Sequence, residues 1–249
     1  YTIFIYFQMS VHLITYGNNH YTKSRDRLVN EAIRTGWFSS VIGYGEEDMS
    51  KEYKEEFKDI LHYERGAGYW IWKPYFILKR LSEIEKGDVL IYLDAGCTIR
   101  QMGRKRFYEY INMLENGCMI SFRMSEHIEK HYTTKEIFEH FGVSHMDSIT
   151  DSGQYLGGIR IMKNNEETLR IMQLEYDTYK ENRMIVTDCF NDKQEDYFVD
   201  NRHEQSIFSV IRKMHKTIVL EDETKQFPLK KRKNYPFFAK RIQDRHLKK

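Results

Sequence analysis

A single carboxylate, Asp94, stands at the end of a short apolar segment, where it is well placed to act on a ligand. Residues 89–93 read Val-Leu-Ile-Tyr-Leu, and Asp94, Ala95 and Gly96 follow directly. A run of this length that is rich in strand-forming residues predicts a buried β-strand. Ligands of α/β sheets bind at the carboxyl ends of strands, so Asp94 is expected to face a metal ion, a sugar or a phosphate. The alternative is an Asp that only caps the next turn.

Residues 65–75, RGAGYWIWKPY, form a second unusual segment that is dense in aromatic, basic and glycine residues. Gly66 and Gly68 permit backbone conformations that other residues resist, and the proline suits the first turn of a helix. Aromatic faces stack on sugars and bases, while Arg65 and Lys73 can bind phosphate oxygens. The segment therefore predicts a recognition loop that leads into a helix, unless its two tryptophans simply fill the core.

Two further segments carry residues that a ligand could approach closely. Thr15, Tyr16 and Gly17 end a predicted first strand, where a backbone turn and an aromatic ring could receive a nucleobase. A plain strand-ending turn is the alternative. Gly157 and Gly158 interrupt a strand-like run, and glycines there weaken a strand unless a ligand or another backbone comes close. A β-bulge without function would also explain the glycine pair.

Length and composition predict one soluble domain of catalytic size. The chain has 249 residues, 41% of them hydrophobic, and no Pro/Gly/Ser-rich linker divides it. No apolar stretch approaches the ~20 residues that cross a bilayer, so we expect no transmembrane anchor. The three cysteines, Cys97, Cys118 and Cys189, lack paired spacing. They argue against a disulfide scaffold or a Cys-ligated zinc site and favour a reducing, cytoplasmic compartment.

The two ends of the chain differ from its centre. Residues 1–8 precede Met9 and resemble an expression leader, so the domain is expected over residues 9–224. Residues 225–249 hold ten Lys or Arg and one acidic residue, Asp244, a net charge of +9 in a chain whose total is +2. Such a tail is usually solvated or disordered. Its aromatic residues also allow peripheral contact with an anionic membrane, and no nucleic-acid-binding fold accompanies it. These aromatic residues are Phe227, Tyr235, Phe237 and Phe238.

Strand-like and helix-like segments alternate along the chain, which predicts an α/β fold with a mostly parallel central sheet flanked by helices. The predicted strands are residues 11–16, 39–44, 89–93, 118–122, 155–162 and 217–220. The predicted helices are residues 24–35, 48–61, 74–86, 104–115, 166–180 and 204–214. The stretch 124–153 is the least regular and predicts an insertion or mobile loop that covers the site.

Four blocks together resemble a family of GT-A-type glycosyltransferases found in large DNA viruses and in bacterial polysaccharide gene clusters. The blocks are HLITYGN at 12–18, RGAGYWIWKP at 65–74, GDVLIYLDAG at 87–96 and NRHEQSIFS at 201–209. The pairing of the second and third blocks is the specific part of the resemblance. It implies a GT-A-like fold and a hexosyltransferase-like enzyme that moves a sugar from a nucleotide sugar, UDP-linked in the first instance, to a hydroxyl of a glycan or glycoprotein.

The resemblance also implies roles for individual residues. Asp94 would bind a Mn²⁺ or Mg²⁺ ion on the donor diphosphate, although GT-A enzymes carry Asp-x-Asp and this chain has Gly96 at the third position. Hard cations take several oxygen ligands, so phosphate and water oxygens, or His203 or His215, would complete the shell. Alternatively, Arg65 and Lys73 would neutralise the diphosphate without metal. The donor-binding candidates are Thr15, Tyr16, Gly17, Arg65, Tyr69, Trp72, Lys73, Asp94, Ala95, Gly157 and Gly158.

Glu204, in the first turn of the last predicted helix, resembles the general base of inverting GT-A enzymes. It would accept the proton of the acceptor hydroxyl, a role worth about 10²–10⁴-fold in rate, with Asp188 and His203 as acceptor-binding candidates. Alternatively, Glu204 only favours the positive N-terminus of its helix, and a retaining mechanism would then be the better hypothesis.

Two other functions stay open on the sequence. A sugar-nucleotide nucleotidyltransferase would share the α/β sheet, but its Gly-rich basic loop after the first strand is poorly matched by Tyr16-Gly17-Asn18-Asn19. A non-catalytic carbohydrate-binding or membrane-docking module would use the aromatic segment and the basic tail.

Overall fold

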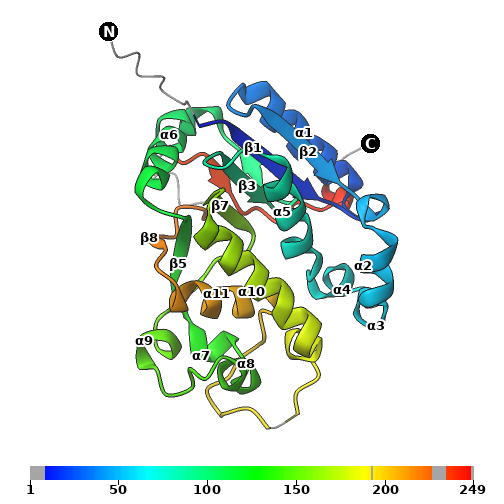
Figure 1. Ribbon diagram of the computed structural model, residues 1–249, viewed down its shortest axis with the longest axis vertical. Coiled ribbons are helices and arrows are strands. Elements are labelled where there is room, and N and C mark those ends of the chain that lie inside the picture. Colours follow the sequence, from blue (N-terminus) through cyan, green and yellow to red (C-terminus); the bar gives the residue numbers. More distant parts are fainter. Residues whose placement is uncertain (1–8, 192, 226–233, 248–249) are drawn as a thin grey trace.

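The protein folds into a central β-sheet with helices packed on both faces (Figure 1). The structure is a computed structural model that describes residues 9–191, 193–225 and 234–247. The sheet runs in the order β2-β1-β3-β7-β5-β6, with β8 also paired to β5, and β4 and β9 form a separate pair. The strands are β1 (Val11–Tyr16), β2 (Ser40–Tyr44), β3 (Val89–Leu93), β4 (Thr98–Ile99), β5 (Met119–Ile128), β6 (Gly153–Tyr155), β7 (Ile159–Lys163), β8 (Ile218–Glu221) and β9 (Phe237–Phe238).

The longer helices cover the sheet, and short helices fill its ends. The helices are α1 (Thr22–Thr35), α2 (Lys51–Glu56), α3 (Lys58–Leu61), α4 (Gly66–Tyr69), α5 (Trp72–Glu83), α6 (Arg104–Met113), α7 (Glu129–Tyr132), α8 (Lys135–His140), α9 (Asp147–Thr150), α10 (Glu166–Asn182) and α11 (Glu204–Met214). Among the described residues, no helix has the length and apolar character that a bilayer crossing requires.

Alternation along the strands creates two cores, one on each face of the sheet. Leu90 and Tyr92 of β3 join a core with α5, α10 and α11, whereas Val89, Ile91 and Leu93 join a core with α1 and α6. Successive side chains of a strand point to opposite faces, so a strand covered on both sides is apolar throughout. Figure 1 shows α5 and α10 side by side over the first of these faces.

The α/β fold with a mostly parallel central sheet is confirmed, although the sheet is mixed: β1, β2, β3, β5 and β8 run in one direction, and β6 and β7 run in the other. β1 is parallel to β2 and β3, and β5 is parallel to β8, whereas β7 is antiparallel to β3 and β5, and β6 is antiparallel to β5. Between β5 and β6 the chain turns back through α7, α8 and α9, which Figure 1 shows together at one end of the molecule. A return at the same end of a sheet gives antiparallel strands, whereas a crossover helix would have given parallel ones.

Residues 124–153, predicted to be an insertion or mobile loop that covers the site, consist mostly of regular elements. They form the end of β5 and then α7, α8, α9 and the start of β6, and they bury Ile137, Phe138 and Ile149. The polar composition that suggested a loop supplies a buried network instead. Glu129, fully buried, pairs with Lys213 Nζ at 2.7 Å and accepts a hydrogen bond from Ser209 Oγ, which ties α7 to α11.

Two other predicted elements are interrupted. The helix predicted over residues 48–61 begins later than predicted, because Ser50 caps α2 by accepting a hydrogen bond from the Tyr53 amide at 3.1 Å. It divides into α2 and α3 where the chain turns at buried Phe57. The strand predicted over residues 155–162 divides into β6 and β7. Across residues 156–158 the pairing with β5 loses its register.

The described part of the C-terminal segment packs on the domain and is not a free tail. β9 pairs with β4, and Tyr235, Phe237 and Phe238 are buried, so these side chains are not exposed to a membrane. Asp244 accepts hydrogen bonds from the backbone N–H groups of Lys23 and Ser24 at the start of α1. Phe227 and the predicted leader at residues 1–8 lie outside the described residues.

We expect Phe237→Ala to lower the free energy of unfolding by roughly 3–5 kcal/mol, because it empties a buried ring site. Phe237 is 1% exposed and its ring lies against Phe107. Phe190→Ala is the matched control, since that ring is 40% exposed and its loss should cost below about 1 kcal/mol. Chemical denaturation of the two variants measures both values, and equal losses would contradict the docked position of β9.

Candidate functional site

Three charged residues from distant segments meet at the carboxyl end of β3. Lys73 Nζ lies 3.1 Å from Asp94 Oδ1 and 2.7 Å from Glu204 Oε1. Lys73 belongs to α5, Asp94 follows β3, and Glu204 is the first residue of α11. The side chains of Lys73 and Glu204 are 2% and 5% exposed, whereas that of Asp94 is 40% exposed. The cluster therefore presents one carboxylate to solvent and keeps its charged partners inside.

Sequence analysis missed three residues that complete the buried part of this cluster. Arg160 of β7 donates to Glu204 Oε1 at 2.9 Å and forms two hydrogen bonds with Glu175 of α10, at 2.6 and 3.0 Å. Tyr179 donates to Glu175 at 3.0 Å. The available signal was a lone arginine in the apolar run of residues 159–162, because an arginine buried in a sheet needs carboxylate partners.

The pairing keeps Lys73 and Glu204 ionised despite their burial. Burial would lower the pKa of Lys73, but Asp94 and Glu204 outweigh it and raise that pKa above its ordinary value. Burial would likewise raise the pKa of Glu204, but Lys73 and Arg160 hold it below its ordinary value. A carboxylate stabilised by two cations is a poor proton acceptor.

An unusual turn precedes Lys73. All five residues of Gly66–Trp70 have a positive φ, between 49° and 88°, although three of them are not glycine, and a left-handed backbone costs such residues roughly 1–2 kcal/mol each. Trp72 Nε1 donates to the Gly66 carbonyl at 3.0 Å, and the Trp72 and Tyr16 ring centroids are 3.9 Å apart. Trp72 thus packs in the core, and its hydrogen bond to Gly66 stabilises the left-handed turn. The ring does not line an open cleft.

The glycine pair of residues 157–158 makes room for the two carboxylates. A Cβ on Gly157 would lie 2.9 Å from Glu204 Oε1, and a Cβ on Gly158 would lie 2.5 Å from Asp94 Oδ2. The Gly157 amide donates to Gln205 Oε1 at 3.0 Å, and the Asp94 amide donates to the Gly158 carbonyl at 2.8 Å. The break between β6 and β7 therefore follows from the close approach of side chains in the cluster.

A second cluster brings the acceptor-binding candidates together with two donor-binding candidates. Asp188 Oδ2 accepts hydrogen bonds from Arg65 Nη1 at 3.1 Å and from the Tyr69 hydroxyl at 3.2 Å. His203 Nδ1 lies 2.8 Å from the Val186 carbonyl oxygen, and its Nε2 lies 3.8 Å from Asp188 Oδ1. Within the described chain this buried Nε2 has no hydrogen-bond partner. The cluster adjoins the first one, because His203 directly precedes Glu204.

Several donor-binding candidates do not offer an exposed side chain. Thr15 and Tyr16 are 0% and 4% exposed, and Gly17 and Ala95 are buried as well. Tyr16 packs against Trp72, so its ring has no free face for a nucleobase. A contact of the nucleotide with these residues stays a prediction.

The residues around Asp94 do not fit a resident divalent cation. Asp94 Oδ1 accepts from the Tyr92 hydroxyl at 2.7 Å and pairs with Lys73, and the described residues contain no group of three His, Cys, Asp or Glu side chains able to hold a metal ion. Mn²⁺ and Mg²⁺ need several oxygen ligands. His215 lies past the far end of α11, paired with Glu167 at 2.8 Å. We therefore assign no step to a metal ion.

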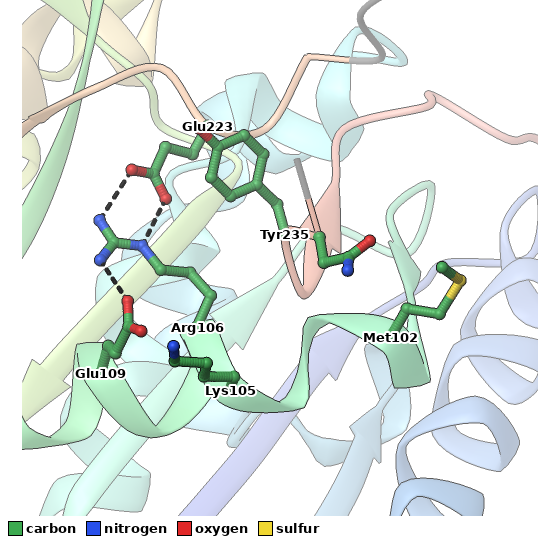
Figure 2. A pocket seen from close by; sticks show the side chains of 7 residues that line it. Met102, Lys105, Arg106, Glu109, Glu223 and Tyr235 are labelled. Atoms are coloured by element: carbon green, nitrogen blue, oxygen red, sulfur yellow. Dashed lines mark hydrogen bonds and ion pairs between the residues drawn. The ribbon is translucent and has the colours of Figure 1, made fainter. Parts of the chain in front are cut away.

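A pocket of about 410 Å³ lies away from these clusters (Figure 2). Figure 2 shows Arg106 held between Glu223 and Glu109, with ion-pair distances of 2.7 Å to each, so its charge is already compensated. None of the predicted site residues lines this pocket. Its lining residues are Met102, Lys105, Arg106, Glu109, Glu223, Asn234 and Tyr235.

No protein-family model matches the sequence, and no curated protein matches it. Solved structures show distant similarity of fold. A glycosyltransferase involved in the glycosylation of the major capsid of PBCV-1 aligns over 86% of this chain and 83% of its own, at 12% identity and a TM-score of 0.49. Mouse xyloside xylosyltransferase 1 aligns over 86% and 85%, at 14% identity and a TM-score of 0.46. The galactosyltransferase LgtC aligns over 80% and 70%, at 11% identity and a TM-score of 0.41.

Lys73→Met should lower the free energy of unfolding by roughly 3–5 kcal/mol, because it leaves buried Glu204 without one of its two cations. Lys79→Met is the control on the same helix. The Lys79 ammonium forms one long hydrogen bond, of 3.4 Å, to the Asp48 carbonyl oxygen, and the residue is partly exposed. Its loss should therefore cost below about 1 kcal/mol. Denaturant titration distinguishes the two, and a Lys73 variant as stable as the wild type would contradict the ion-pair geometry.

The stability of the protein should fall as the pH drops from about 7.5 to 5.5, and His203 should cause part of this loss. Burial lowers the pKa of His203 below its ordinary value, whereas a histidine in the unfolded chain titrates near 6.5. The unfolded state therefore binds more protons below that pH, which lowers the free energy of unfolding. His203→Gln should flatten the slope, and exposed His20→Gln should not. An unchanged slope in His203→Gln would refute the assignment.

Proposed function

We propose that this protein is a glycosyltransferase that moves a sugar from a nucleotide-sugar donor, with a UDP-linked hexose as the first choice, to a hydroxyl of a glycan or glycoprotein. The observation that carries the proposal is the meeting of three sequence blocks at one site. RGAGYWIWKP supplies Lys73, GDVLIYLDAG supplies Asp94 and NRHEQSIFS supplies Glu204, and the ammonium lies within 3.1 Å of both carboxylates. These are the blocks that resemble GT-A-type transferases, and the carboxyl end of a strand is where α/β folds bind ligands.

Asp94 is the group of the cluster best placed to contact the donor. Lys73 and the Tyr92 hydroxyl both bind its Oδ1, and its side chain is 40% exposed. No side chain in the described residues donates a hydrogen bond to Oδ2, which leaves that oxygen free to accept one from a sugar hydroxyl. The fixed carboxylate therefore orients the sugar rather than a metal ion.

The transfer requires positive charge near the leaving group. The bond between the anomeric carbon and the diphosphate oxygen breaks and a bond to the acceptor oxygen forms. The acceptor proton passes to Glu204 in an inverting reaction, or to the departing diphosphate oxygen in a retaining one. Arg65, which is 50% exposed, can neutralise the departing diphosphate, and the buried Lys73 adds a fixed positive field. Asp188, which pairs with Arg65, and the neighbouring His203 stay the candidates for binding the acceptor.

The role of Glu204 as the general base stays a prediction, and its surroundings favour another role. Its carboxylate is buried, pairs with both Lys73 and Arg160, and has a lowered pKa. We propose that Glu204 positions Lys73 against Asp94. With Glu204 in that role, a retaining mechanism becomes the better hypothesis.

The structure gives less support to the two alternative functions. A nucleotidyltransferase would bind phosphate after β1, but the Asp244 carboxylate occupies the start of α1 there. A carbohydrate- or membrane-binding module would need exposed aromatic residues, but Tyr69 and Trp72 are 6% and 4% exposed. The cytoplasmic location, a peripheral membrane contact and the lack of a nucleic-acid partner stay predictions.

The donor can be identified by a thermal-shift panel of UDP- and GDP-sugars, followed by measurement of the released nucleoside diphosphate. One donor of this class should raise the melting temperature and be turned over with a suitable acceptor. If no nucleotide or sugar nucleotide stabilises the protein at millimolar concentration, the transferase proposal fails.

Asp94→Asn should lower kcat/KM for the sugar nucleotide by about 10²-fold or more, because it removes the one exposed charge of the cluster while preserving its shape. The melting temperature of the variant without ligand shows whether it still folds. Asp147→Asn, on the exposed surface of α9, is the matched control and should keep the wild-type rate. Wild-type turnover by the Asp94 variant would remove Asp94 from the mechanism.

A further inference from the structure

The C-terminal segment fills the space in which a second acidic side chain would stand. A Cβ on Gly96 would lie 2.9 Å from Arg241 Cα and 2.9 Å from the Ile242 nitrogen. The Ile242 amide also donates to the Gly96 carbonyl at 3.1 Å. A carboxylate at position 96 would collide with this backbone. The same packing that requires glycine at this position brings a cation, Arg241, to the Asp94 turn.

Two anchors hold Arg241 over the turn. On one side, β9 pairs with β4, with Phe238 opposite Thr98. On the other side, the Asp244 carboxylate accepts from the Lys23 amide at 3.0 Å and from the Ser24 amide at 2.7 Å. A carboxylate is favoured at the positive N-terminus of a helix, and α1 has 14 residues. The position of Arg241 is therefore set by the fold on both sides.

The Arg241 side chain is available for a ligand. It is exposed, and within the part of the chain that the structure describes it forms no ion pair and donates no hydrogen bond. Gly96 and Asp94 are two residues apart, which is at most about 7 Å along the backbone. An extended arginine side chain spans a comparable distance, which is long enough to bridge from Gly96 to a group bound at Asp94.

A diphosphate bound near Asp94 would need an additional positive charge, which Arg241 can supply. Lys73 is already compensated by Asp94 and Glu204, and Arg65 is paired with Asp188. A bound diphosphate would bring more negative charge than the half-exposed Arg65, which is shared with Asp188, can neutralise alone. Guanidinium is permanently charged and matches phosphate oxygens with two parallel hydrogen bonds.

We propose that Arg241 binds the diphosphate of the donor in the place where other sites use a metal ion, so that nucleoside diphosphates bind this protein without a divalent cation. The inference rests on the proposed function, because it concerns the leaving group of the same donor. Asp244 is a positioning residue in this arrangement, since it acts only by holding the segment that carries Arg241.

The test is calorimetric titration of UDP, and separately GDP, into the 249-residue protein in the presence of EDTA and in the presence of Mn²⁺. Arg241→Asn is the informative variant, because asparagine tolerates the positive φ of 54° found at this position. Arg241→Lys keeps the charge but not the fork of donors. Arg245→Asn, an exposed arginine on the same segment, is the control for net charge.

The wild type should bind one of the two nucleotides with a dissociation constant that differs by less than about twofold between EDTA and Mn²⁺. Arg241→Asn should bind about tenfold more weakly in both conditions, because a charge-assisted hydrogen bond is lost. Arg241→Lys should lie between, and Arg245→Asn should bind like the wild type. The melting temperature of each variant without nucleotide controls for folding.

Three results would overturn the inference while leaving the proposed function intact: binding that requires Mn²⁺, wild-type affinity in Arg241→Asn, or equal weakening by Arg245→Asn. If neither nucleotide binds the wild type in either condition, the proposed function itself fails, and the inference falls with it.

Discussion

The buried ammonium of Lys73 is the constraint on which the rest of the site depends. A charge with 2% exposure is unfavourable unless it is paired, so Lys73 requires Glu204, Glu204 is shared with Arg160, and Arg160 requires Glu175. These partners come from α5, α11, β7 and α10, which must therefore pack in one arrangement. Sheet register supports it, because Tyr92 of β3 stands opposite Arg160 of β7 and reaches Asp94 on the same side.

Local sequence patterns predicted most elements but not their pairing. The bounds of α1, α6, α10 and α11 and of β1, β2 and β3 agree with the predictions to within a few residues, because periodicity and chain breaks are local properties. The direction of β7 depends on the return through α7, α8 and α9, which is stabilised by the contact of Glu129 with Ser209 and Lys213, far apart in sequence. Long-range contacts of this kind leave no local pattern, so the antiparallel direction of β6 and β7 was not predicted.

The same distinction applies to the candidate site residues. Lys73, Asp94 and Glu204 were recognisable because each is a charge next to an apolar or aromatic run, where burial forces a partner. Tyr16 and Trp72 were assigned to ligand binding because aromatic residues stack on sugars and equally on each other. Their ring centroids are 3.9 Å apart, so they stack on each other. The burial of Tyr235, Phe237 and Phe238 was not predicted, because the many Lys and Arg residues around them indicated a solvated tail.

The energetics of the cluster indicate that it exists for positioning and not for stability. Replacing a buried ion pair by apolar residues of similar size is often neutral or stabilising, so a stable core does not need Lys73 and Glu204. Strained backbone precedes both: the left-handed turn Gly66–Trp70 leads to Lys73, and His203, with φ 58° and ψ −124°, leads to Glu204. Each such residue costs roughly 1–3 kcal/mol and persists only where its surroundings enforce it. The strained segments place Lys73 and Glu204 so that the half-exposed Asp94 carboxylate is held in one orientation by two buried partners, Lys73 and Tyr92.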